Sequence, residues 1–179
     1  MVKRISLPGF AAPGGAKHFL ALCVLALALG LVVAKFFYTP VWAVPIGGVG
    51  ALYLLTRERA GSFRVGFCYA VGLFAPLFQF TQVSMGNPLG WVALTIFESL
   101  YLAVFAWLWA AVSGTAWVRE HLLSGAAIFA FLFAGCEQLR SSWPLGGFAW
   151  ARLAQSQIYS PLLPLASWLG SSGLTFVVA

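Results

Sequence analysis

The chain has 179 residues, of which 61% are hydrophobic and 8% are charged, and its formal net charge is +6. Soluble globular chains average roughly 45–50% apolar and 25% charged residues. Ten Lys or Arg and four acidic residues therefore cannot coat a water-exposed surface of this size. This composition excludes an ordinary soluble enzyme, a disordered tail and a disulfide-stapled secreted module. Because the basic residues stand in ones and twos between apolar runs, nucleic acid is not an expected partner.

Long apolar runs predict an all-α, polytopic membrane protein with about six transmembrane helices. A bilayer core needs about 20 apolar residues per helix, and every backbone amide in it must be bonded internally. The uncharged stretch 65–97 is too long for one helix, and the turn-forming residues 84–90 divide it. The six predicted helices cover about residues 19–37, 40–56, 65–83, 91–112, 122–136 and 161–179, the last still apolar at Ala179.

The basic residues predict the orientation, because Lys and Arg near helix ends are retained in the cytoplasm. Seven lie on the side of the N-terminus: Lys3, Arg4, Lys17, Arg57, Arg59, Arg64 and Arg119. Three lie on the other side: Lys35, Arg140 and Arg152. We therefore expect a cytoplasmic segment 1–18, membrane helices 1–5 within 19–136, an extracytoplasmic loop 137–160 and the start of a sixth helix at 161–179. No small-x-small cleavage site follows the first run, so we expect that run to remain as a helix.

Residues that commonly bind metals or act as nucleophiles are isolated. The three cysteines, Cys23, Cys68 and Cys136, lie alone in apolar segments without a His nearby. Cys136 is next to Glu137, but adjacent helical residues point about 100° apart, which disfavours a nucleophile and base pair. The sequence therefore predicts no catalytic residue, no metal site and no cofactor within these residues.

Glu98 is a charged residue inside the fourth predicted helix, where a carboxylate costs a few kcal/mol and marks a functional or interhelical contact. Gln79 and Gln82 share one face of the third helix, and Gln79 lies at a depth similar to that of Glu98. Two alternatives follow. A Gln79–Glu98 hydrogen bond joins the two helices, or these residues line a polar recess that opens toward the outer loop. In the second case Glu98→Gln is expected to leave folding intact and to lower activity.

The loop 137–160 combines turn-forming and aromatic residues. Pro144 and the Gly146-Gly147 pair forbid a continuous helix, while Trp143, Phe148 and Trp150 supply flat, amphipathic surface. Glu137 and Arg140 are three residues apart and are expected to pair at the end of the fifth helix. The loop is either an aromatic belt with a salt bridge, or a site where acyl chains pack on aromatic rings and a phosphate or carbonyl meets Arg140.

These residues resemble a pattern of the apolipoprotein N-acyltransferase family. The family pattern has Glu-x-x-Arg, then Trp-Pro-Phe-Gly-Gly-Phe-Pro-Trp, then Leu-Gly-x-Ser-Gln, and then a helix that opens with Pro-Leu. The matching residues here are Glu137, Arg140, Trp143, Pro144, Gly146, Gly147, Phe148, Trp150, Leu153, Ser156, Gln157, Pro161 and Leu162. The departures are Leu145, Ala149 and Ala154, and Phe80 stands where the family leads us to expect Trp.

The resemblance implies a bacterial enzyme of the cytoplasmic (inner) membrane. It transfers an acyl chain from a phospholipid to the N-terminal diacylglyceryl-cysteine of a lipoprotein through a thioester intermediate. The family has eight membrane helices and a nitrilase-like domain that carries a catalytic Glu-Lys-Cys set. These three catalytic residues match no position in the present sequence. We therefore expect residues 1–179 to be the membrane part, cut in or after its sixth helix and inactive alone. The residues expected to bind substrate are Glu98, Glu137, Arg140, Trp143, Gly146, Gly147, Phe148, Trp150 and Gln157.

Two other classes remain open at this point. A small self-contained six-helix transporter or lipid-binding protein would use Glu98 and the outer loop as a substrate path. The first and second three helices show no convincing repeat, which disfavours a transporter built from inverted repeats. A structural scaffold subunit is the third class.

Overall fold

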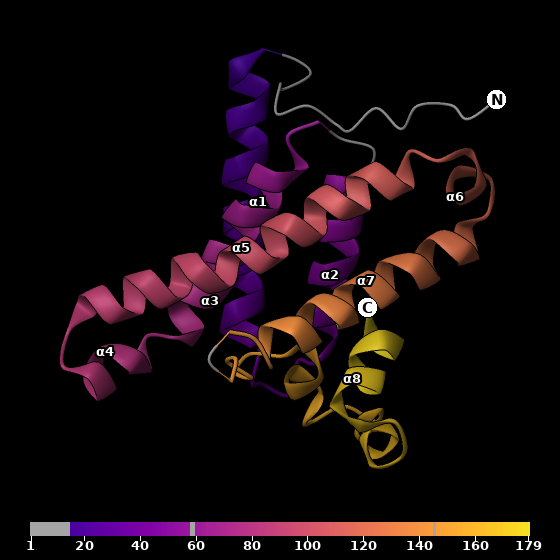
Figure 1. Ribbon diagram of the computed structural model, residues 1–179. Helices are drawn as coiled ribbons and strands as arrows, with labels where there is room; N and C mark the ends of the chain where they lie inside the picture. Colours follow the sequence, from indigo (N-terminus) through magenta and orange to yellow (C-terminus); the bar gives the residue numbers. More distant parts are fainter. Residues whose placement is uncertain (1–14, 58–59, 145) are drawn as a thin grey trace.

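The structure is a computed structural model that describes residues 15–57, 60–144 and 146–179. Lys3, Arg4 and Arg59, which entered the orientation count, lie outside the described residues. Regular structure in the described part is entirely helical (Figure 1). Its elements are α1 (Ala16–Phe36), α2 (Ala43–Thr56), α3 (Ser62–Leu77), α4 (Phe80–Met85), α5 (Pro88–Ser113), α6 (Ala116–Glu120), α7 (Leu122–Arg140), the 3-10 turns η1 (Leu153–Gln157) and η2 (Leu163–Leu165), and α8 (Ala166–Val178).

Three helices of the described chain, α1, α5 and α7, are long and apolar enough to cross a membrane. The helices α2 and α3 and the segment 163–178 are apolar but shorter. An all-helical fold with membrane-type helices is therefore confirmed, whereas the count of six spans stays a prediction.

The third predicted helix, 65–83, is two helices in the structure. Helix α3 ends at Leu77, one residue after Pro76, and α4 begins at Phe80. Proline donates no backbone hydrogen bond and its ring crowds the carbonyl four residues earlier, so it breaks a helix. The break places Phe78 and Phe80 at a bend, where their rings contact Phe148 and Trp150 of the loop that follows α7.

The sixth predicted helix is also interrupted. Its first residues form η2, and α8 is kinked at Gly170, whose backbone adopts φ 66° and ψ −179°. Helix α5, by contrast, begins earlier than predicted. Asn87 caps it by accepting a hydrogen bond from the Leu89 N–H at 2.8 Å, and Pro88 occupies its first turn.

Helix α3 packs between α1 and α5. Where α1 and α3 cross, a Cβ atom at Gly30 would overlap the backbone of Tyr69, and a Cβ at Gly72 would overlap the backbone carbonyl of Leu27. Small residues at such crossings allow helix backbones to approach closely, which is the main source of packing energy between helices in lipid. The two glycines thus fix α1 against α3.

An aromatic cluster joins α2, α5 and α7. It consists of Tyr53, Phe105, Trp109, Phe129 and Phe133, whose neighbouring ring centroids lie 4.9–6.2 Å apart. Most of these pairs meet edge to face, the arrangement that aromatic quadrupoles favour. The cluster is part of the hydrophobic core of the bundle.

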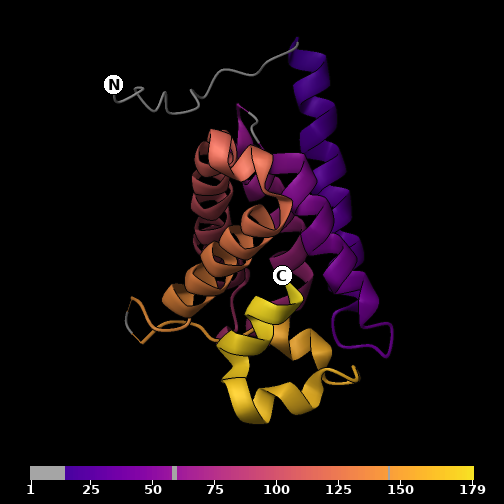
Figure 2. The ribbon, with the colours of Figure 1, turned by 90° about the vertical axis from the view of Figure 1, so that its right-hand side faces the viewer.

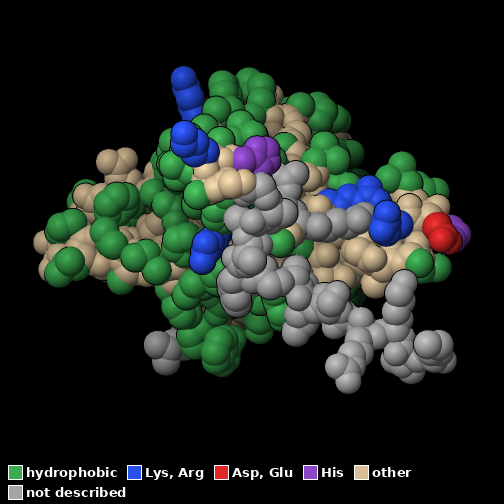
Figure 3. All heavy atoms as spheres, turned by 90° about the horizontal axis from the view of Figure 1, so that it is seen from above, with side chains coloured by type: hydrophobic (Ala, Val, Ile, Leu, Met, Phe, Trp, Pro, Cys, Tyr) green, Lys and Arg blue, Asp and Glu red, His purple; other side chains and the backbone are tan. Residues whose placement is uncertain are grey.

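The two ends of the bundle differ in character. Lys17 at the start of α1, Arg64 at the start of α3 and Arg119 in α6 belong to the end at the top of Figure 1. Seen from that end, Lys and Arg side chains stand among apolar ones (Figure 3). The opposite end is covered by the segment 141–179, which lies below α7 (Figure 2). The alternation of the loops across a membrane and the choice of the cytoplasmic end both stay predictions.

Candidate functional site

The candidate site is built on the last turns of α7. This helix continues to Arg140, one turn beyond the predicted end at residue 136, so Glu137 and Arg140 both stand on a regular helix. Both side chains are buried. Two charged residues of opposite sign therefore leave one helix inside the protein, and each needs partners from other segments.

The Arg140 guanidinium contacts residues from three other segments of the chain. Its Nη1 donates to Glu98 Oε2 at 2.9 Å and to the Phe148 carbonyl at 3.1 Å, and its Nη2 donates to the Trp150 carbonyl at 2.8 Å. The guanidinium also lies over the Phe74 ring, 5.1 Å from its centroid. The Arg140 side chain is 0% exposed. One guanidinium thus ties α5, α3 and the loop to the end of α7.

The predicted pairing of Glu137 with Arg140 is wrong. Glu137 Oε1 accepts from the Leu153 N–H at 2.6 Å, and Oε2 accepts from the Thr175 hydroxyl at 2.8 Å. The Arg152 Nε is 3.9 Å from Oε2. Glu137 therefore anchors η1 and α8, while Arg140 anchors the loop that precedes them.

Glu98 does form a contact between two helices, as one of the two alternatives predicted, but its partner is Arg140 and not Gln79. The carboxylate is buried and joins α5 to α7 through Arg140. Gln79 is exposed beside the bend that follows α3. The sequence could not indicate this partner, because Arg140 is 42 residues away and lies on a helix whose predicted end came before it.

A second set of polar side chains, Arg152, Ser172 and Gln138, is hydrogen-bonded together next to Glu137. Arg152 Nη2 donates to the Ser172 hydroxyl at 2.7 Å and to Gln138 Oε1 at 3.3 Å. The Ser172 hydroxyl donates to the same Gln138 oxygen at 2.7 Å. Arg152, which sequence reasoning counted only as an orientation signal, therefore links α7 to α8.

A tight turn follows α7. The Gly147 N–H donates to the Pro144 carbonyl at 2.8 Å, and the Phe148 N–H returns to the Arg140 carbonyl at 2.9 Å. Gly147 has φ 72°, and a Cβ there would overlap the backbone of Ser141 and Ser142. Gly146 also has a positive φ of 93°, but a Cβ there would meet open space. Only Gly147 is required by both conformation and space.

Of the three aromatic residues in the loop motif, Phe148 packs against the helices, whereas Trp143 and Trp150 are exposed. Phe148 packs edge to face on Phe78, with centroids 5.0 Å apart. Trp150 lies 5.2 Å from Phe80 and is 47% exposed, and Trp143 is 61% exposed. Phe80, the departure from the expected Trp, thus packs on a motif residue. The two exposed tryptophans are suited to the membrane interface.

Gln157 belongs to a different part of the structure from the Arg140 cluster. Its Nε2 donates to the Trp42 carbonyl at 3.3 Å and to the Ser156 hydroxyl at 2.9 Å, which ties η1 to the start of α2. The structure therefore brings Glu98, Arg140, Phe148 and Trp150 together. It places Glu137, Gln157, Trp143 and the glycines around them rather than among them.

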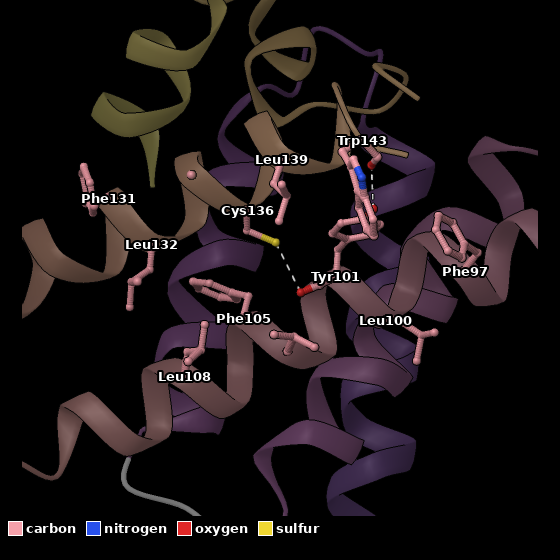
Figure 4. Close-up of a pocket in the computed structure, with 12 residues that line it drawn as sticks. Phe97, Leu100, Tyr101, Phe105, Leu108, Phe131, Leu132, Cys136, Leu139 and Trp143 are labelled. Carbon is pink, nitrogen blue, oxygen red and sulfur yellow. Dashed lines mark hydrogen bonds between the residues drawn. The ribbon is translucent and has the colours of Figure 1, made fainter. Parts of the chain in front are cut away.

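Sequence reasoning missed three residues that complete these contacts: Tyr101, Arg152 and Thr175. The Tyr101 hydroxyl donates to the Trp143 carbonyl at 2.6 Å and so ties α5 to the loop (Figure 4). Tyr101 lies three residues after Glu98 and therefore on the same face of α5, which is a signal that was present. Thr175 gives no such signal, because a Thr in an apolar helix commonly bonds its own backbone.

The matching family model is described as the apolipoprotein N-acyltransferase N-terminal domain, and it covers residues 25–179. The chain belongs to the apolipoprotein N-acyltransferase family. A curated relative of that name from Azotobacter vinelandii is 33% identical over 181 residues, which cover 93% of this chain and 33% of the relative. One from Pseudomonas aeruginosa (strain UCBPP-PA14) is 32% identical over 183 residues, with 93% and 33% covered. One from Haemophilus ducreyi is 29% identical over 171 residues, with 89% and 32% covered.

The chain thus spans about a third of the length of these apolipoprotein N-acyltransferases. The family match includes α5, α7, the loop and α8, and hence all the contacts of Glu98, Glu137 and Arg140. The resemblance seen in the motif residues is therefore confirmed.

Proposed function

We propose that this chain forms the membrane part of an enzyme that acylates the N-terminal cysteine of bacterial lipoproteins. The observation that carries the proposal is the family match over residues 25–179. Three of the motif residues in this range, Arg140, Phe148 and Trp150, meet in the cluster around the Arg140 guanidinium. The match also favours this function over the transporter and scaffold alternatives. The proposed substrates are a membrane phospholipid, as acyl donor, and a diacylated lipoprotein, as acceptor.

The proposed role of the buried charges is to position the loop. Because the Arg140 side chain is 0% exposed and bonds Glu98 and two loop carbonyls, its guanidinium is not accessible to a phosphate in this conformation. Glu137 holds η1 and α8 in the same indirect way. Direct contact with lipid then falls to the exposed Trp143 and Trp150, which the turn at Gly146 and Gly147 presents.

The proposed chemistry has two steps. A Cys thiolate attacks an ester carbonyl of the phospholipid, which forms a thioester and releases a lysophospholipid. The α-amine of the diacylglyceryl-cysteine then attacks the thioester, which forms an amide and returns the thiol. The Glu-Lys-Cys set for these steps matches no position in residues 1–179. We assign it to a nitrilase-like domain and expect residues 1–179 to be inactive alone.

The proposed location is the bacterial inner membrane, crossed several times, with the N-terminus in the cytoplasm and residues 137–160 outside. Seven of the ten basic residues support this orientation. In it, the Arg140 cluster lies near the outer surface of the bilayer, where the acceptor lipoprotein is displayed.

A reconstitution assay tests the proposed function. The intact protein, which joins residues 1–179 to the proposed nitrilase-like domain, is placed in liposomes of phosphatidylethanolamine and phosphatidylglycerol with a diacylated lipopeptide. The peptide is then analysed by mass spectrometry. We expect one added acyl chain on its N-terminal amine, lost when the phospholipids are replaced by ether-linked analogues. Transfer that persists with the ether lipids, or no transfer by the intact protein, contradicts the proposal. Transfer by residues 1–179 alone contradicts the expected inactivity.

A further inference from the structure

A small cavity lies inside the bundle, beside the buried side chain of Glu137. Its volume is about 10 Å³. A cavity needs about 10–15 Å³ on this measure to hold one water molecule, so it has room for one and no more. Residues of α1, α2, α3, α5, α7 and the segment 151–153 line it, and the polar side chains among these are those of Tyr69 and Glu137.

Tyr69 brings a hydroxyl group into the interior of the bundle. Its side chain is 0% exposed, and the hydroxyl forms no hydrogen bond with any residue that the structure describes. A buried hydroxyl without a hydrogen bond is costly, because it has lost its contacts with bulk water. Native proteins satisfy nearly all such groups, and they use ordered water where no protein group is within reach.

Gly48 of α2 leaves the space that the Tyr69 hydroxyl occupies. A Cβ atom at Gly48 would lie 3.3 Å from the hydroxyl oxygen and would overlap the Val33 side chain. Val33 and Val49 both line the cavity, so the hydroxyl lies near the wall that α1 and α2 form. The valine side chains on this wall offer the hydroxyl no acceptor.

Glu137 reaches the same cavity from α7 and has acceptor capacity to spare. A carboxylate has about four acceptor sites. The Leu153 N–H and the Thr175 hydroxyl each donate one hydrogen bond to it. The Arg152 Nε is 3.9 Å from Oε2, which is beyond hydrogen-bond distance. The Glu137 carboxylate can therefore accept a further hydrogen bond.

We propose that the cavity binds one water molecule that joins Tyr69 to Glu137. The water accepts a hydrogen bond from the Tyr69 hydroxyl and donates one to the Glu137 carboxylate. Buried waters make about two to four hydrogen bonds to groups that protein leaves unsatisfied, and these two side chains supply two. Through this water Tyr69 is a positioning residue for the carboxylate that holds η1 and α8. The inference does not depend on the proposed function.

An experimental structure of the intact protein in lipid, at a resolution that shows ordered waters, tests the inference. Wild type is compared with Tyr69→Phe, which removes the hydroxyl and keeps the ring. The control is Tyr53→Phe, which removes a hydroxyl from the aromatic cluster, because Tyr53 does not line the cavity.

In wild type we expect one water within hydrogen-bond distance of the Tyr69 hydroxyl and of a Glu137 carboxylate oxygen. The water should be lost in Tyr69→Phe and retained in Tyr53→Phe. An empty cavity in wild type, or a Tyr69 hydroxyl bonded directly to a protein group or a lipid, would overturn the proposal. The wild-type structure alone decides between these outcomes, so the test does not depend on the folding of Tyr69→Phe.

Amide hydrogen exchange of the intact protein measures the positioning role. Tyr69→Phe should raise exchange rates across residues 153–178 about tenfold, as expected for the loss of one hydrogen bond, whereas Tyr53→Phe should leave them unchanged. Unchanged or slower exchange in Tyr69→Phe would show that the hydroxyl has no partner in the native state, which overturns the proposal.

A third variant separates the water from the tyrosine. Val49→Ile adds one methylene group to a buried residue at the cavity wall, so it should displace the water while Tyr69 stays in place. It should also raise exchange across residues 153–178, and combining it with Tyr69→Phe should add little further increase. Fully additive effects of the two substitutions would show that they act independently and would overturn the shared water.

Discussion

Glu98 and Arg140, 42 residues apart in the sequence, form a buried ion pair of 2.9 Å that joins α5 to α7. Because the same guanidinium also bonds the carbonyls of Phe148 and Trp150, the pair fixes the loop as well as the two helices. Buried ion pairs are costly to break from one side, since the remaining charge is left without a partner. The pair is therefore the most sensitive point of the site.

Removal of either charge should destabilise the protein. We predict that Arg140→Ala lowers the free energy of unfolding by about 3–5 kcal/mol, because it strands the Glu98 carboxylate. Glu98→Gln should destabilise it in the same direction, contrary to the expectation from sequence that this change leaves folding intact. Thermal unfolding in detergent measures both. The control is Lys35→Ala, an exposed basic residue whose loss should change stability by less than about 0.5 kcal/mol. Equal stability of Arg140→Ala and the control would refute the anchoring role.

The two adjacent glycines should respond differently to alanine. Gly146→Ala incurs only the strain of a positive φ, about 1–2 kcal/mol. Gly147→Ala adds an overlap with the backbone of Ser141 and Ser142, so it should destabilise the turn much more. Tryptophan fluorescence of Trp143 and Trp150 during unfolding reports on this loop, with the other tryptophans replaced by phenylalanine where folding permits. Similar losses from both substitutions would show that the turn relaxes around Gly147.

Thr175 should hold α8 in place through its hydrogen bond to Glu137. Thr175→Val keeps the shape of the side chain but removes the donor to a buried carboxylate, at a cost of about 1–3 kcal/mol. Because Glu137 also accepts from the Leu153 N–H, amide hydrogen exchange should increase across 153–178. Ser171→Ala, at an exposed position on the same helix, serves as the control. Unchanged exchange in Thr175→Val would mean that α8 is held by its apolar contacts alone.

Opposite ends of the bundle should be labelled from opposite sides of the membrane. In a background without Cys23, Cys68 and Cys136, a membrane-impermeant maleimide added to intact cells should label Ser142→Cys. It should label Glu120→Cys only after the cells are opened. Both positions are exposed in the structure. Labelling of Glu120→Cys in intact cells would reverse the proposed orientation.

The fold was predictable where one local property decides it. Apolar runs locate α1, α5 and α7, and the Gly146-Gly147 pair with Pro144 indicates the turn. Interruptions within apolar runs were harder to predict. Pro76 and Gly170 each interrupt a helix, yet neither residue by itself tells a kink from an end.

Arg140, Phe148 and Trp150 of the family pattern meet in one cluster, but the partners of the charged residues were not predictable from the sequence. The binding of substrate by these residues stays a prediction. Glu137 and Arg140 stand at a spacing that favours a pair on one helix, but burial brings each to a stronger set of partners from distant segments. An exposed pair at this spacing contributes about 0.2–0.5 kcal/mol. A buried charge must satisfy its hydrogen bonds wherever the fold supplies acceptors, and those positions depend on tertiary structure.

The most direct test of the proposed function is a domain exchange. Residues 25–179 of this chain replace the equivalent third of the Azotobacter vinelandii relative, and the hybrid is expressed in bacteria depleted of their own enzyme. Mass spectrometry of a lipoprotein N-terminus then reads acylation directly. We predict N-acylated lipoprotein with the hybrid, and a strong loss with the same hybrid carrying Arg140→Ala. Lipoprotein that remains diacylated, although the hybrid is folded and present in the membrane, would contradict the account.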